Sequence, residues 1–315
     1  YKGAQISINF NNYKKSTIHD VFDKACSLAT ERGIRVTGSE LVGLIPLEAM
    51  LMAGKHYLKK QSRSIGVPTS DIIECAVQSL GLNDVSPFLV NEKIIDYVVK
   101  DETNTAFDSA FLNDVSLNTP TPGGGSVSAL VGSLGSALCS MVAALTHDKK
   151  EMFNSRSMME EIGIEAQKLK DDLADLVLED CLAFNKVLDA VRSPAISKED
   201  KTRKKKNILV ANKYAIEIPY KISEKCYKVM QLSEVLIKKG NPSSLTDASV
   251  AAEVAFAGLR GGCMNVMINL KDLDEKLYVS KKQNEVDKLL SKGKTLHEKL
   301  FNNTVKALTK KNNDT

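Results

Sequence analysis

An aspartate on an apolar helical stripe is the residue of this sequence best suited to proton chemistry. In residues 169–188, LKDDLADLVLEDCLAFNKVL, apolar residues recur at intervals of three and four, and Asp180 falls on that face between Val177 and Phe184. Burial disfavours the charged carboxylate and raises its pKa, which suits a general acid or base near neutral pH. A structural aspartate that pairs with a lysine or an amide of the next helix would show the same pattern, so the sequence leaves both interpretations open.

A glycine-rich stretch is the second feature that could contact a ligand. Gly123, Gly124 and Gly125 follow a Thr-Pro pair and precede Ser126. Their backbone can lie against a flat ligand, and the free N–H groups of a helix start can bind an anion or a carbonyl. A sharp helix entry capped by Ser126 explains the same residues without a ligand. Dinucleotide and P-loop motifs are excluded, because Ser128 stands where a glycine is needed and no lysine follows the glycines.

The uncharged run that follows, residues 127–145, is long enough to cross a membrane. Gly, Ser and Cys are frequent in it, and the rest of the chain offers neither a second span nor an aromatic belt. We therefore expect no membrane span. The run predicts a helix buried on all sides, whose small residues let neighbouring helices or a second subunit approach closely.

Two asparagines lie four residues apart on an otherwise apolar segment. Asn265 and Asn269 share one face of residues 245–270, and buried amides need hydrogen-bond partners. A ligand or the neighbouring backbone can supply those partners, and the sequence does not decide between the two.

The composition narrows the class of protein. The 315 residues are 43% hydrophobic and 26% charged, which is typical of a globular protein with one large or two ordinary domains. The net charge of +4 is small, and the basic run 201–206 has no interleaved aromatic residues, so we predict no nucleic-acid partner. That run predicts either a solvated helix face or a patch that attracts a polyanionic tail.

Cysteines and histidines show no metal or disulfide pattern. The six cysteines are scattered without a C-x-x-C pair, and most lie in apolar helical patterns, which predicts buried free thiols in a reducing compartment. The four histidines form no zinc motif, so we predict no metal. Because the sequence begins at Tyr1 without a signal-peptide pattern, we expect a cytoplasmic protein that continues from a missing upstream segment.

The predicted secondary structure that positions these residues differs between the two parts of the chain. Residues 1–100 alternate strand and helix signals, in the order typical of an α/β or α+β layer. Residues 101–108 are polar and aperiodic, which predicts a linker. In the first part we expect a strand at 5–10, a strand and a turn within 34–45, and helices at 17–32, after Pro46 and at 70–80.

Residues 109–315 carry no strand signal and predict an all-α bundle of long helices. Pro219 falls inside the third long helix and is expected to kink it. The long helices are expected at 126–146, 152–192, 199–239, 245–270 and 274–308.

Four stretches of the helical part resemble one known family, in the same order. PTPGGGSVSALVGSLGSALCSMVAALT, LVLEDCLAF, GNPSSLTDASVAA and NVMINLKDL resemble the cyclodeaminase domain of formiminotransferase-cyclodeaminases. Residues 5–51, from QISINF to LEAML, resemble the later part of the formiminotransferase C-terminal subdomain. The resemblance implies a mainly α protein, in which a partial α/β (α+β) formiminotransferase C-terminal subdomain precedes an all-α helical bundle.

The resemblance implies an activity in histidine breakdown. The cyclodeaminase of this family closes 5-formimino-tetrahydrofolate to 5,10-methenyl-tetrahydrofolate and releases ammonia, with a tetrahydrofolate derivative as substrate and no prosthetic group or metal. The family's catalytic aspartate falls on Asp180. Related stand-alone domains are methenyltetrahydrofolate cyclohydrolases, so that activity remains an alternative, as does a non-catalytic folate-binding or helical dimerisation module.

Further residue roles follow from the same resemblance. The transferase half of the family moves a formimino group from formiminoglutamate to tetrahydrofolate, and its catalytic histidine belongs to an N-terminal subdomain that is absent here. No motif marks His19 or His56 as a replacement for that histidine, so we expect no transferase activity from this chain alone.

The resemblance also implies an assembly and substrate contacts. We expect a homodimer or a higher homo-oligomer. The candidates for pterin and aminobenzoyl contacts are Gly123, Gly124, Gly125, Ser126, Asn265 and Asn269, and those for attracting a polyglutamate tail are Lys149, Lys150, Lys204, Lys205 and Lys206.

Overall fold

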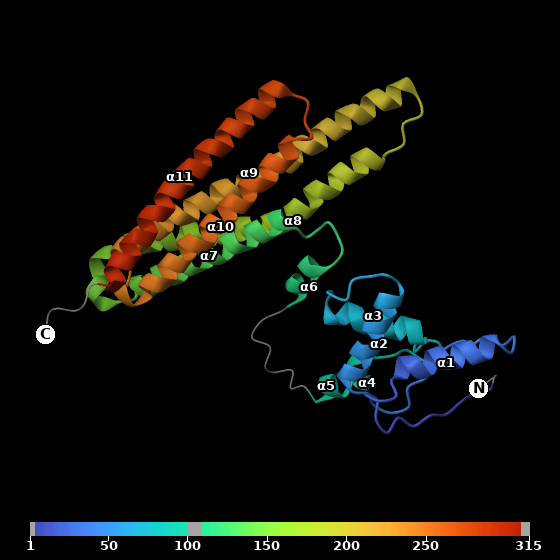
Figure 1. The fold of residues 1–315 in the computed structure, drawn as a ribbon. Coiled ribbons are helices and arrows are strands. Elements are labelled where there is room, and N and C mark those ends of the chain that lie inside the picture. The colour runs from blue at the N-terminus through green and yellow to red at the C-terminus, as the bar shows by residue number, and fades with distance from the viewer. Residues whose placement is uncertain (1–3, 100–108, 310–315) are drawn as a thin grey trace. The chain divides into compact units, whose positions relative to one another are not determined.

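The computed structural model describes residues 4–99 and 109–309. The chain divides into two compact units, Tyr1–Thr119 and Pro120–Thr315, and each is described by itself (Figure 1). The predicted linker at 101–108 lies outside the described residues, so that boundary stays a prediction.

The first unit is built from short helices. Its core lies where α2 packs on α3, with Met50, Ala53 and Ile73 buried between them. Gly81 ends α3 in the left-handed conformation, with a φ of 60°, which glycine adopts without strain. Its helices are α1 (Ile18–Thr30), α2 (Leu47–Lys60), α3 (Thr69–Leu80), α4 (Val90–Lys93), α5 (Ile95–Val98) and α6 (Ala110–Ser116), so the three predicted helices are confirmed.

The two predicted strands, at 5–10 and 34–45, do not form in the described residues. A bridge between Ile45 and Ile94 is the one β contact among the described residues of this unit. A strand needs a neighbouring strand to satisfy its backbone groups, and alternation of apolar residues cannot supply one. Ile6 and Ile8 accordingly stay 76% and 48% exposed. The mainly α class is nevertheless confirmed.

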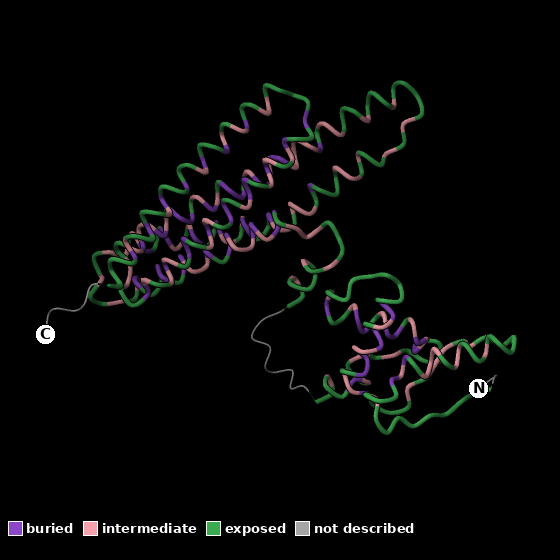
Figure 2. The backbone as a smooth tube through the Cα atoms, viewed as in Figure 1, coloured by how far each residue is buried: buried purple, intermediate pink, exposed green. Residues whose placement is uncertain are grey.

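Five long helices build the second unit, as predicted. They run side by side around one apolar core, and Figure 2 shows the buried residues on the faces where the helices meet. Short 3₁₀ turns at Lys150–Ser155 and Pro242–Ser244 connect them. The helices are α7 (Gly124–His147), α8 (Arg156–Arg192), α9 (Lys198–Lys239), α10 (Leu245–Leu270) and α11 (Lys276–Thr309), within a few residues of the predicted bounds.

Small residues bring the backbones of α7 and α10 close together. A Cβ on Gly258 would lie 2.7 Å from the carbonyl oxygen of Ser128, and a Cβ on Gly135 would lie 2.9 Å from that of Ala251. Neither contact would be possible with a larger residue. The glycine and serine content of the uncharged run therefore serves helix packing.

One face of α7 remains uncovered, which corrects the expectation that this helix is buried on all sides. It packs against α8, α9 and α10, whereas Leu134, Met141 and Leu145 are 54%, 41% and 48% exposed. Among the described residues α7 is the one helix long and apolar enough to span a membrane, but half of its most apolar stretch is buried inside the bundle. Burial of that extent is typical of a core helix in a bundle.

Candidate active site

The start of α7 and the middle of α8 meet at Asp180. The Ser126 hydroxyl donates to Asp180 Oδ2 at 3.0 Å, and the Ser126 backbone N–H also donates to this carboxyl group. The Cα of Gly125 lies so close that a Cβ there would overlap the carboxylate. Glycine at position 125 is thus required by the position of Asp180.

Burial is the largest influence on Asp180 and raises the pKa of its carboxyl group above the usual range. The two hydrogen bonds from Ser126 favour the charged form and partly offset that effect. Asp180 forms no ion pair with a lysine or arginine of the described residues. Its environment therefore differs from that of a structural aspartate paired across helices, and its carboxyl group is easier to protonate than that of an exposed aspartate.

Cys181 belongs to this cluster and was not singled out by the sequence. Its Sγ lies 3.3 Å from the Ser126 hydroxyl, and its side chain is half-buried, whereas Cys139, Cys226 and Cys263 of the same unit are buried. In the sequence, its position next to Asp180 could have indicated this contact, because a side chain adjacent to the apolar stripe can reach the start of α7.

The structure also brings Asn265 to the glycine loop. A Cβ on Gly124 would lie 3.4 Å from Asn265 Nδ2, and this amide donates to the Gly261 carbonyl at 2.8 Å. The Ser128 hydroxyl donates to the Gly124 carbonyl at 2.6 Å, and Gly123 is the N-cap residue of α7. Glycine backbone, a carboxyl group and an amide thus converge at one end of α7.

Asn269 has a partner within the bundle. Its Nδ2 donates to the Ala215 carbonyl at 2.7 Å. Ala215 lies four residues before Pro219, which has no N–H to donate, so the amide of Asn269 satisfies the carbonyl that the proline leaves without its helical partner. A contact between Asn269 and a ligand stays a prediction.

The lysines that we expected to attract a polyglutamate tail lie away from the glycine loop. Lys149 donates to Asn241 Oδ1 at 3.2 Å, and both Lys149 and Lys150 follow the C-terminal end of α7. That helix has 24 residues, which at about 1.5 Å per residue separates them from Gly124 by roughly 36 Å within one chain.

The second lysine group lies along the start of α9. Lys204 donates to the Ser193 carbonyl, Lys205 is exposed, and Lys206 lines a cavity of about 570 Å³ between α8 and α9. Lys186 lies over the Tyr214 ring in the same cavity. None of these lysines contacts the glycine loop among the described residues.

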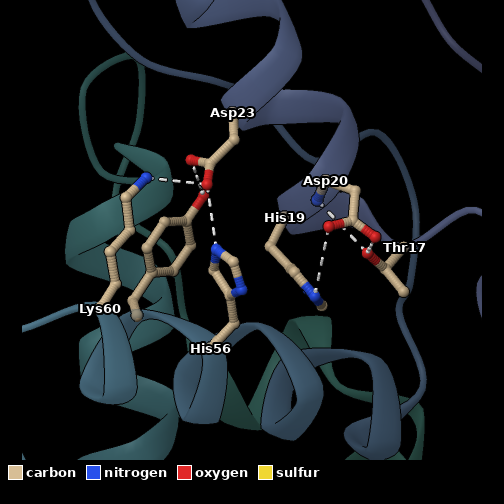
Figure 3. Close-up of polar contacts among 7 residues, drawn as sticks. Thr17, His19, Asp20, Asp23, His56 and Lys60 are labelled. Carbon is tan, nitrogen blue, oxygen red and sulfur yellow. Dashed lines mark hydrogen bonds and ion pairs between the residues drawn. The ribbon is translucent and has the colours of Figure 1, made fainter.

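A separate cluster of titratable groups lies in the first unit (Figure 3). The rings of His19 and His56 stack with centroids 4.4 Å apart, and His56 Nε2 lies 2.9 Å from Asp23 Oδ2. Asp23 also accepts hydrogen bonds from Tyr57 and Lys60. His19 is buried and its Nδ1 has no hydrogen-bond partner among the described residues. These contacts join α1 to α2.

The fold and the site together define an all-helical bundle protein with one half-buried carboxyl group, that of Asp180, at the glycine-lined start of α7. The chain belongs to the formiminotransferase-cyclodeaminase family, since the family model of that description matches residues 109–288. A second family model, described as a formiminotransferase domain, matches residues 1–100. The resemblance inferred from the sequence motifs is confirmed.

Individual relatives agree with this assignment. Formimidoyltransferase-cyclodeaminase of Rattus norvegicus is 32% identical over 297 residues, which are 93% of this chain and 55% of the relative. The match takes in most of this chain, but the chain spans only about half the length of such curated relatives. Methenyltetrahydrofolate cyclohydrolase of Methylorubrum extorquens is 33% identical over 197 residues, 62% of this chain and 94% of that protein.

A solved structure shares the helical fold. Formiminotetrahydrofolate cyclodeaminase from Thermotoga maritima superposes with a TM-score of 0.54 and 27% sequence identity. The match covers 66% of this chain and 98% of the other. The bundle is therefore of the cyclodeaminase type.

Proposed function

We propose that the helical unit is a formimidoyltetrahydrofolate cyclodeaminase. It converts 5-formimino-tetrahydrofolate to 5,10-methenyl-tetrahydrofolate and ammonia, which makes it a lyase. The observation that carries the proposal is the Asp180 carboxyl group, with its raised pKa, at the glycine-lined start of α7. Family membership and the likeness to the Thermotoga maritima cyclodeaminase support it.

The reaction needs one proton to move between two nitrogens. N10 of the folate attacks the formimino carbon and forms a new C–N bond, and N10 loses its proton. The bond from that carbon to the formimino nitrogen then breaks, and the nitrogen leaves as ammonia once it has gained a proton. Starting from the protonated formimino group, CH=NH2+, the Asp180 carboxylate takes the proton from N10 and returns it to the leaving nitrogen. The nitrogen departs as NH3 and the positive charge stays on the 5,10-methenyl group, so atoms and charge balance.

The groups around Asp180 hold the substrate for this step. The side-chain-free backbone from Gly123 to Gly125 accommodates a flat ring, and the amide of Asn265 offers both a donor and an acceptor beside it. N10 and the formimino group belong to the same folate, so the attack is intramolecular, and holding the two in an attack geometry lowers its entropic cost. No prosthetic group is needed in this scheme.

A cyclohydrolase activity is the second candidate, favoured by the match to the Methylorubrum extorquens enzyme. That relative aligns with 62% of this chain, whereas the formimidoyltransferase-cyclodeaminases align with more than 90% of it. The wider alignment favours cyclodeaminase. Assays with 5-formimino-tetrahydrofolate and with methenyl-tetrahydrofolate distinguish the two, because only the first releases ammonia.

The test of the proposal is Asp180→Asn. We expect methenyl-folate formation from 5-formimino-tetrahydrofolate to fall by about 10²–10⁴-fold, the usual contribution of a positioned acid–base group. Asp175→Asn, on the exposed side of the same helix, is the matched control and should retain activity. Turnover by folded Asp180→Asn close to that of the wild type would reject the assignment.

Residues 1–100 match a formiminotransferase domain, but we propose that these 315 residues alone do not transfer formimino groups. His19 and His56 stack on each other and His56 pairs with Asp23, in contacts that join α1 to α2, and no motif marks either as the transferase histidine. Formimino transfer from formiminoglutamate by the purified chain would refute this.

We also propose that the protein is cytoplasmic and forms a homo-oligomer.

A further inference from the structure

The cavity of about 570 Å³ between α8 and α9 takes no part in the proposed reaction. It lies where these two helices extend past the start of α7 (Figure 1). The residues that line it belong to the last two turns of α8, to its C-cap Ser193 and to the first half of α9. Its volume is within the range of small-molecule sites, about 300–1,000 Å³.

The cavity is separate from the Asp180 site. An α-helix turns by about 100° per residue, so Lys186 lies about 120° around α8 from Asp180, and Asp189 lies on the opposite side. Asp180 faces the start of α7, whereas the described residues that line the cavity include none from α7 or α10. A ligand in this cavity therefore does not occupy the place of a folate at the glycine loop.

Two lysines give the cavity a positively charged wall. Lys186 and Lys206 both line it, are exposed, and form no ion pair with a carboxylate of the described residues. Lys186 Nζ lies 4.1 Å from the centre of the Tyr214 ring, and the Tyr214 hydroxyl donates to Glu179. This cation–π contact holds the ammonium group at the cavity wall and leaves its N–H groups free for an anion.

The segment around the cavity also attracts anions. Residues 186–206 contain eight lysines and arginines and three acidic residues, a net charge of +5, whereas the whole chain carries +4. Lys204 donates to the carbonyl of Ser193 at 2.7 Å, so its ammonium group is already engaged. The excess of positive charge raises the local concentration of anions near Lys186 and Lys206.

One carboxylate lies in the same cavity as these ammonium groups. Asp189 lines the cavity, is exposed, and pairs with no lysine or arginine of the described residues. A ligand that is only an anion would leave this carboxylate facing a like charge, which is unfavourable. A ligand with two carboxylates and one ammonium group matches Lys186, Lys206 and Asp189 together.

We propose that the cavity between α8 and α9 binds an α-amino dicarboxylate such as glutamate, with Lys186 and Lys206 on the two carboxylates and Asp189 on the ammonium group. Val210 supplies an apolar contact for the methylene groups of the ligand, and the Asn207 amide offers a donor and an acceptor. Because the charged groups are exposed, each ion pair contributes little, and we expect a Kd of about 1–10 mM.

Saturation-transfer difference NMR with the whole chain and free glutamate tests this inference, because the method detects weak ligands of large proteins. Glutamate should give a saturable signal. Glutarate has the same two carboxylates without the amine, and we expect it to bind about threefold more weakly, since it cannot pair with Asp189. Absence of a saturable signal from glutamate, or equal affinity for glutarate, would overturn the proposal.

Variants assign the signal to this cavity. Lys186→Gln/Lys206→Gln should weaken glutamate binding about fivefold or more, since two ion pairs are lost. Asp189→Asn should weaken the binding of glutamate but not that of glutarate, because only glutamate carries the ammonium group. The matched control is Lys288→Gln/Lys292→Gln, which changes two exposed lysines on α11 and should keep the wild-type Kd. A Kd for Lys186→Gln/Lys206→Gln no higher than that of the control would contradict the assignment.

Asp180→Asn separates this cavity from the candidate active site. It should bind glutamate as the wild type does, because Asp180 faces away from the cavity. Loss of glutamate binding in this variant would place the ligand at the glycine loop and overturn the proposal. A wild-type chain that binds glutamate as expected but forms no methenyl-folate would refute the proposed function and leave the glutamate site intact.

Discussion

Gly125 on α7 and Asp180 on α8 are in such close contact that a single added carbon on the glycine would occupy the space of the carboxylate. The glycine thus does two things at once. It lets the helices approach, and it lets the Ser126 hydroxyl and N–H reach the carboxyl group. The burial that raises the pKa of the Asp180 carboxyl group and the Ser126 hydrogen bonds that oppose this rise therefore both depend on a residue without a side chain.

Gly125→Ala should abolish activity with a limited loss of stability. The added methyl group must displace Asp180, and overpacking of this kind costs about 1–3 kcal/mol. We expect methenyl-folate formation to fall at least a hundredfold while circular dichroism still shows a folded bundle. Gly163→Ala, on α8, is the matched control, because its Cβ would meet only the Cβ of Ala143 at an ordinary contact distance of 3.9 Å. Equal activity of the two variants would contradict this account.

Ser126→Ala should shift the pH dependence of the reaction. The serine hydroxyl stabilises the charged carboxylate, so its removal raises the pKa of Asp180 further. Because proton abstraction from N10 needs the carboxylate, the acidic limb of kcat/KM should move to higher pH. Ser133→Ala, which removes a hydroxyl bonded to the Lys170 carbonyl in the same helix contact, should leave the limb in place. If the acidic limb of the kcat/KM profile did not move in Ser126→Ala, this hydroxyl would have no influence on the pKa of Asp180.

The sequence predicts the helices well because their signals are local. Apolar spacing and breaks such as Ser193-Pro194 set the bounds of α8 and α9, and the same spacing identified Asp180. Contacts between helices depend on which faces meet, so the Ser126 hydroxyl and Cys181 were not recognised as neighbours of that carboxyl group. The strand predictions at 5–10 and 34–45 failed for the related reason that pairing requires a distant partner.

The first unit should lose stability in mild acid through His19. Burial, and then the charge of His56, lower the pKa of this imidazole, while Asp20 and Asp23 oppose the shift. When a base has a lower pKa in the folded state, the unfolded chain binds the proton more strongly. Stability should therefore fall as the pH drops below about 6.5, the ordinary histidine value, and level off below the lowered pKa of His19.

Hydrogen exchange of the α1 amides, corrected for intrinsic rates, measures this effect. Asp20 and Asp23 from α1 and Tyr57 from α2 lie against the two imidazoles. Lys60 bonds to Asp23 (Figure 3), and Cys26 also lies near Asp23. Protection of α1 should decrease between pH 8 and pH 5, with α3 as the internal reference. His19→Phe keeps a stacking ring without the titration and should flatten the response. Unchanged wild-type protection across this range would contradict the role of His19.

Asn269 and Pro219 should be energetically coupled through the Ala215 carbonyl. Asn269→Ala leaves the carbonyl of the half-buried Ala215 without a donor, which costs about 1–3 kcal/mol of unfolding free energy. Pro219→Ala restores a backbone N–H at position 219, and this N–H can donate to Ala215 as in an ordinary helix turn. The cost of Asn269→Ala should therefore be smaller in the Pro219→Ala background.

Denaturant unfolding of the four chains in this double-mutant cycle gives the coupling free energy directly. Asn207→Ala, an exposed asparagine on the same helix as Pro219, serves as the control and should be additive with Pro219→Ala. Strict additivity of Asn269→Ala with Pro219→Ala, combined with a raised KM for folate, would instead assign the Asn269 amide to the substrate. The cycle thus separates the packing role that the structure gives Asn269 from the binding role that its spacing from Asn265 first indicated.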